Sequence, residues 1–124
     1  MGVFAYQNRN NTVALNLIKK ALIIKPDYAE AHNNLGVVFK ELKEIDEAIT
    51  CYKKALKLNK DYAEAHYNLG VALKEIGKLD EAIASYKRAL EDKPGYAEAL
   101  YNLGNALNEC GKLEEAIANY RKTI

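Results

Sequence analysis

Residues Ala29–Tyr62 read AEAHNNLGVVFKELKEIDEAITCYKKALKLNKDY, and Ala63–Tyr96 read AEAHYNLGVALKEIGKLDEAIASYKRALEDKPGY. The two stretches are identical at 19 of 34 positions, and a third copy opens at Ala97. Self-similarity at a fixed period of roughly 20 to 50 residues is typical of repeat proteins. In these proteins each repeat is one supersecondary unit that buries its apolar face against its neighbours. The period therefore predicts an array of similar units.

Particular residue types return at the same place in each copy. The recurring positions are Leu35-Gly36, Leu69-Gly70 and Leu103-Gly104, then Ala48, Ala82 and Ala116, then Tyr52, Tyr86 and Tyr120, with Pro26 and Pro94 at two repeat ends. In these positions the whole chain resembles the tetratricopeptide repeat (TPR) family. The resemblance implies an all-α fold, a right-handed superhelix (α-solenoid) of antiparallel helix pairs. Lys60 departs from the pattern, because it stands where the family has its terminal proline.

The register sets the expected boundaries. We expect a single TPR domain over 1–124, made of a partial repeat (1–28), two repeats (29–62 and 63–96) and a repeat truncated in its second helix (97–124). The first helices are expected at Tyr28–Leu42, Tyr62–Ile76 and Tyr96–Cys110, and the second helices at Ile45–Leu58, Leu79–Asp92 and Leu113–Ile124. Turns are expected at Lys43-Glu44, Gly77-Lys78, Gly111-Lys112 and, in the first unit, at the polar cluster Asn8-Arg9-Asn10-Asn11.

The glycine of each Leu-Gly pair falls inside an expected helix. Glycine there costs about 1 kcal/mol against alanine, so a glycine in every copy needs a packing reason. We expect Gly36, Gly70 and Gly104 to let the second helix of each unit approach closely. The tyrosines of the second helices should belong to the core.

The bulk composition excludes several classes of function. The net charge is +1, so no strong field attracts nucleic acid or an anionic membrane. The sequence has neither an apolar run long enough to span a membrane nor a secretory signal. Cys51 and Cys110 occupy non-equivalent positions, which favours free thiols over a disulfide. These features predict a cytoplasmic protein with no nucleic-acid or membrane partner.

No arrangement of catalytic or metal-binding residues stands out. His32 and His66 lie one repeat apart, the third copy has Leu100 there, and no neighbouring residues supply the other ligands that zinc needs. There is no glycine-rich phosphate loop and no serine or cysteine nucleophile beside a histidine. The sequence predicts a chain with no catalytic residues, metal or cofactor.

The family resemblance places a peptide-binding groove on the concave face, lined by the first helices. Mapped onto this chain, the candidate binding residues are Asn33, Asn34, Val37, Lys40, Tyr67, Asn68, Val71, Lys74, Tyr101, Asn102, Asn105 and Asn108. Asn34, Asn68 and Asn102 form one column, although asparagine is a poor helix former. A side-chain amide can pair with the N–H and C=O of any peptide backbone. The column resembles the asparagine ladder in the TPR array of O-linked N-acetylglucosamine transferases; alternatively, these residues only join neighbouring helices.

Three functions from different classes stay open. The leading interpretation is a non-catalytic scaffold that binds an extended or helical peptide segment of another protein. The second is a substrate-recognition array cut from a larger glycosyltransferase-like enzyme. The third is a structural module that self-associates through its uncapped ends, because neither end of the chain falls on a repeat boundary.

Overall fold

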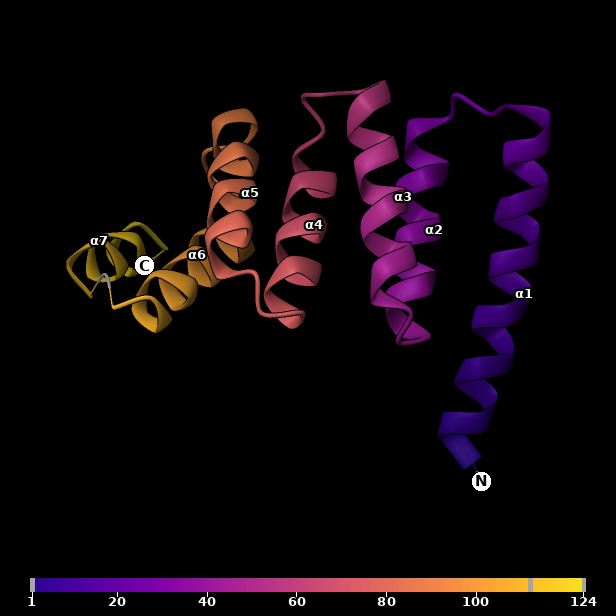
Figure 1. Cartoon of the computed structure of the whole chain (residues 1–124), viewed down its shortest axis with the longest axis horizontal. Coiled ribbons are helices and arrows are strands. Elements are labelled where there is room, and N and C mark those ends of the chain that lie inside the picture. Colours follow the sequence, from indigo (N-terminus) through magenta and orange to yellow (C-terminus); the bar gives the residue numbers. More distant parts are fainter. Residues whose placement is uncertain (1, 112, 124) are drawn as a thin grey trace. The chain divides into compact units, whose positions relative to one another are not determined.

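The protein is all-α. The computed structural model describes the backbone of residues 2–111 and 113–123, with side chains over 9–111 and at 115, 117, 118 and 120–122. These residues form helices joined by short turns, and the described part of the chain contains no strand (Figure 1). The helices are α1 (Gly2–Ile24), α2 (Ala29–Glu41), α3 (Ile45–Leu58), α4 (Ala63–Glu75), α5 (Leu79–Asp92), α6 (Ala97–Glu109) and α7 (Leu113–Thr123).

The chain divides into two compact units, Met1–Lys60 and Asp61–Ile124. In the first unit α2 packs against both α1 and α3. In the second unit α4 packs against α5 and α6, α6 packs against α5 and α7, and consecutive helices run antiparallel because the turns between them are short. The predicted all-α class with antiparallel pairing is thus confirmed, and α3 and α5 have the predicted bounds.

The turn predicted in the first unit is wrong. Helix α1 runs without interruption from Gly2 to Ile24, through the polar cluster at residues 8–11. The later turns each contain a residue with a left-handed backbone: Lys43 (φ 67°), Gly77 (φ 82°) and Gly111 (φ 79°). Asn11 is instead buried within the continuous helix, with only 6% of its surface exposed.

Each hairpin is closed by a tyrosine ring lying against a glycine. A β-carbon built at Gly36 would lie 2.5 Å from Cε1 of Tyr52, and one at Gly70 would lie 2.6 Å from Cε1 of Tyr86. A β-carbon built at Gly104 would lie 2.7 Å from Cε1 of Tyr120. Real side chains essentially never come so close, which confirms the expected packing role of the glycine column.

Candidate functional site

Polar side chains join α4 and α6 along one face of the second unit. The amide Nδ2 of Asn102 donates a hydrogen bond of 2.8 Å to the hydroxyl of Tyr67. Farther along, Nζ of Lys74 lies 3.3 Å from Oε1 of Glu109. Both contacts join residues 35 positions apart, one repeat plus one residue. The α4–α6 face is defined here as Tyr67, Asn68, Val71 and Lys74 of α4 with Tyr101, Asn102, Asn105, Asn108 and Glu109 of α6.

A cluster of tyrosines lies behind the Asn102–Tyr67 hydrogen bond. The ring centroid of Tyr67 is 5.1 Å from that of Tyr96 and 6.0 Å from that of Tyr86. Burial, with a smaller effect of Glu64, raises the pKa of Tyr96 to about 12. Burial also raises the pKa of Tyr67 and of Tyr86. These phenols therefore stay neutral at physiological pH and can act as hydrogen-bond donors or acceptors.

The outer part of the α4–α6 face offers groups to a ligand. Tyr101 is 54% exposed, while its ring centroid is held 6.0 Å from that of Tyr120. Asn108 is exposed, and Asn68, Val71 and Asn105 are half-buried. The face therefore combines an exposed aromatic ring with several side-chain amides, and its one cation among these residues, Lys74, is paired with Glu109.

The remaining predicted groove residues lie on α2, in the other unit. Asn34 is exposed and Val37 and Lys40 are half-buried. Asn33, which occupies the column of Tyr67 and Tyr101, is only 6% exposed. Its side chain is therefore part of the packing of α2 and presents little surface to a ligand.

Two equivalent tyrosine hydroxyls have different partners. The hydroxyl of Tyr120 donates a hydrogen bond to Oδ1 of Asn105. In the preceding hairpin the column of Asn105 holds Val71, which has no acceptor. Accordingly the hydroxyl of Tyr86 is buried without a hydrogen-bond partner among the described residues. A buried hydroxyl with no partner costs free energy, whereas a paired one does not.

This difference predicts opposite effects of the same substitution. Tyr86→Phe should leave the free energy of unfolding unchanged or raise it by up to about 1 kcal/mol, because it removes an unpaired buried hydroxyl. Tyr120→Phe should lower it by about 1 kcal/mol, because Asn105 loses its hydrogen bond. Urea unfolding of both variants checks this, and equal destabilisation by the two would contradict the assignment.

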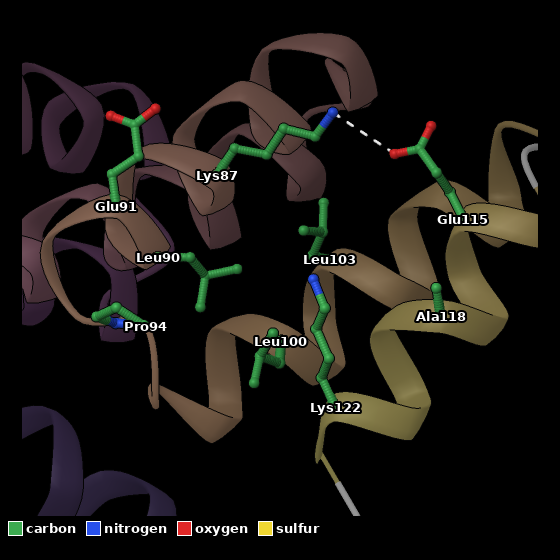
Figure 2. Close-up of a pocket in the computed structure, with 9 residues that line it drawn as sticks. All are labelled: Lys87, Leu90, Glu91, Pro94, Leu100, Leu103, Glu115, Ala118 and Lys122. Carbon is green, nitrogen blue, oxygen red and sulfur yellow. Dashed lines mark ion pairs between the residues drawn. The ribbon is translucent and has the colours of Figure 1, made fainter.

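The second unit also carries a hollow that the sequence analysis missed. It has a volume of about 670 Å³ and lies between α5, α6 and α7 (Figure 2). Its floor is apolar, with Leu90, Leu100 and Leu103, and at its rim Lys87 reaches across to Glu115, with 3.6 Å between Nζ and Oε2. The sequence offered one signal for this apolar floor, because Leu100 stands where the two earlier copies have histidine.

Family models for tetratricopeptide repeats match most of the chain. A "TPR repeat" model matches residues 38–77 and 72–109, and two "Tetratricopeptide repeat" models match residues 4–49 and 97–124. The chain belongs to the tetratricopeptide-repeat family. No curated protein matches the TPR chain.

Solved structures of MamA resemble this TPR chain. One MamA crystal structure is 31% identical with a TM-score of 0.87, covering 100% of this chain and 74% of its own. A second is also 31% identical, with a TM-score of 0.84, covering 91% of this chain and 62% of its own. A third, MamA AMB-1, is 28% identical with a TM-score of 0.76, covering 88% and 60%. The resemblance of the asparagine column to the glycosyltransferase array stays a prediction.

The described part of the TPR chain shows no cluster of metal-binding side chains. Among the described residues no three histidine, cysteine or acidic side chains come together as metal ligands, and no helix has the length and apolar character to cross a bilayer. His32 instead pairs through Nε2 with the carbonyl oxygen of Pro26 at 2.8 Å. Burial raises the pKa of the Cys51 thiol to about 11, so this cysteine is a poor nucleophile.

Proposed function

We propose that this chain is a non-catalytic protein-interaction module whose α4–α6 face binds an extended peptide segment of another protein. Membership of the TPR family and the likeness to MamA support a protein-interaction scaffold. The observation that carries the finer proposal is the amide of Asn102, fixed by the hydroxyl of Tyr67 beside the exposed ring of Tyr101. An oriented amide loses little freedom when a peptide binds.

The hydrogen-bonding capacity of Asn102 suits a peptide backbone. A side-chain amide has two donor hydrogens and a carbonyl acceptor, and the bond to Tyr67 uses one donor hydrogen. Asn68 holds the same column on α4, which contacts α6 directly. Packed helices lie about 10 Å apart, and three residues of extended chain span about the same distance. The two asparagines thus fit one amide for every three ligand residues.

The charge of the α4–α6 face indicates a ligand with little net charge. Lys74 is neutralised by Glu109 at 3.3 Å, and the remaining groups of the face are amides, tyrosines and a valine. Backbone recognition by amides gives affinity without strict sequence demands, and the exposed ring of Tyr101 adds apolar contact area. We therefore expect a preference for extended segments with an apolar or aromatic residue opposite Tyr101.

The test is calorimetric titration with a 12-residue peptide selected from a random library against the wild-type protein. Asn68→Ala combined with Asn102→Ala should weaken binding roughly 5- to 150-fold, since each lost hydrogen bond is worth about 0.5–1.5 kcal/mol. Tyr67→Phe keeps the amide but removes its support, so its effect should be smaller and in the same direction.

The matched controls change other surfaces of the protein. The control variants are Lys53→Ala on α3 and Lys87→Ala on α5. Lys87 belongs to the rim of the hollow. Neither should change the affinity for the peptide at fixed salt. If the lysine variants lose binding while the asparagine variant keeps it, the proposal is wrong, and the asparagines only join neighbouring helices.

A further inference from the structure

Two asparagines one turn apart on α6 are each held by a tyrosine hydroxyl. Asn102 donates through Nδ2 to the hydroxyl of Tyr67, 2.8 Å away, and Asn105 accepts through Oδ1 from the hydroxyl of Tyr120. Residues three positions apart are neighbours on the surface of a helix, with their β-carbons about 5–6 Å apart. The two side-chain amides therefore lie side by side, one held through its donor and the other through its acceptor.

These tyrosine contacts leave complementary groups for a ligand. Asn102 keeps its carbonyl Oδ1 as an acceptor, and Asn105 keeps the hydrogens of its Nδ2 as donors. Among the described residues neither of these atoms has a hydrogen-bond partner. Both asparagines are half-buried, so part of each residue reaches the surface of the α4–α6 face. We call Asn102 and Asn105 the amide pair.

A peptide that binds as proposed above meets Asn105 with a side chain, and the present inference rests on that proposal. The line from Asn68 to Asn102 joins two helices and therefore runs across α6, whereas Asn105 lies one turn farther along α6. In an extended chain the side chains stand at right angles to the backbone N–H and C=O groups. When backbone groups face Asn102, the neighbouring side chains therefore point along α6, and one of them reaches Asn105.

The surroundings of Asn105 favour a neutral polar side chain at this point. The two earlier copies have Val37 and Val71 in its column, so the hydrogen-bonding group is particular to the third copy. Farther along the face, Lys74 is already paired with Glu109 at 3.3 Å. An ionised ligand side chain would lose hydration here without gaining a free counterion. The side chain that fits is uncharged and offers both a donor and an acceptor.

We propose that the amide pair binds the side-chain carboxamide of a glutamine or asparagine in the ligand peptide. The N–H of this carboxamide donates to Oδ1 of Asn102, and its C=O accepts from Nδ2 of Asn105. A carboxamide carries its donor and its acceptor on separate atoms, as the amide pair does, whereas a hydroxyl carries both on one atom. The amide pair thereby adds a demand on sequence to the sequence-tolerant recognition of the backbone.

The first test selects peptides from a displayed random 12-residue library, in parallel against the wild-type protein and against Asn105→Val. This variant gives α6 the residue that α4 carries in the same column. We expect the wild-type pool to be enriched in glutamine or asparagine at one position, and the variant pool to lose that enrichment. A wild-type pool without the enrichment, or equal enrichment in both pools, overturns the proposal. Failure of both proteins to select any peptide overturns the proposed function as well.

Calorimetric titration then measures the contact itself. The probes are one peptide selected by the wild-type protein and the same peptide with its glutamine replaced by methionine, or its asparagine by leucine. These replacements keep the approximate size and remove two hydrogen bonds, so binding to the wild-type protein should weaken about 5- to 150-fold. With Asn105→Val the two peptides should bind much more alike, because the losses from a shared contact do not add. Additive losses contradict the assignment.

The controls separate this inference from the proposed function. Asn108→Val makes the same change at an exposed residue farther along α6, and it should leave the affinity ratio of the two peptides unchanged. Tyr120→Phe keeps Asn105 but releases its amide, so the ratio should fall part of the way. Asn68→Ala should weaken both peptides equally. If it does so while the two peptides bind the wild-type protein alike, only the carboxamide site is wrong; if it has no effect on either, the proposed function fails too.

Discussion

Replacing Gly70 by valine should lower the free energy of unfolding by more than 2 kcal/mol. A β-carbon at Gly70 would lie 2.6 Å from Cε1 and 2.7 Å from Cδ1 of Tyr86. The ring cannot move aside freely, because Tyr86 is fully buried. Valine adds two further methyl groups at the same place, so α4 and α5 must separate or the ring must leave its rotamer, and overpacking of this kind typically costs 1–3 kcal/mol or more. The urea unfolding midpoint measures the loss.

Gly95→Ala is the matched control for this prediction. Nothing lies within 4 Å of a β-carbon at Gly95, so this change should stay within about 0.5 kcal/mol of wild type. A double-mutant cycle of Gly70→Ala with Tyr86→Leu isolates the contact, because the smaller side chain relieves the overlap and the two losses should not add. An unchanged midpoint for Gly70→Val would mean that the glycine column has no packing role.

The repeat made the local part of the fold predictable. The bounds of α3 and α5 and the close approach of Gly70 to Tyr86 depend on contacts inside a single hairpin. Those contacts are encoded by residues less than one period apart, and comparison of the copies identifies them directly. The left-handed backbone at Gly77 and Gly111 was predictable for the same reason, since glycine adopts it at low cost.

The first unit shows where the sequence pattern stopped being informative. Asparagine clusters favour turns, yet they are also compatible with a helix when packing supports it, as the burial of Asn11 indicates. The register predicted a hairpin by analogy with the later copies, whereas the chain forms one helix. Among the described helices α1 packs against α2 alone, so several of its apolar side chains, such as Leu17, are exposed, and the repeat register alone could not indicate this.

The candidate site was only partly predictable. The column of Asn68 and Asn102 could be read from the repeat, but the contacts that orient the α4–α6 face join residues 35 positions apart. Comparing the repeats relates only residues that are 34 positions apart. It therefore cannot show that Asn102 contacts Tyr67 or that Lys74 contacts Glu109. That one-residue offset follows from how one first helix lies against the next, which is a tertiary property.

Raising the pH above 10 should destabilise the protein steeply through its buried tyrosines. Tyr96 is 8% exposed with its pKa raised to about 12, mainly by burial, and Tyr86 is fully buried with its pKa also raised. An unfolded phenol titrates near pH 10. Above that pH the unfolded state therefore holds fewer protons than the folded state. The contribution of these tyrosines to the free energy of unfolding is fully present below pH 10 and is lost as the pH rises. Each of the two tyrosines should contribute about 1.4 kcal/mol per pH unit.

By pH 12 the loss from Tyr86 and Tyr96 together should be on the order of 5 kcal/mol, which is comparable with the whole stability of many domains. Lysines also lose their charge in this range, but exposed pairs such as Lys93 with Glu64 contribute little. The measurement is the urea midpoint from pH 9 to pH 12. Tyr86→Phe combined with Tyr96→Phe should flatten the dependence, whereas Tyr101→Phe, which removes a largely exposed ring hydroxyl, should not. If the double variant loses stability as steeply as wild type, the buried tyrosines are not the cause, and lysine deprotonation takes their place as the explanation.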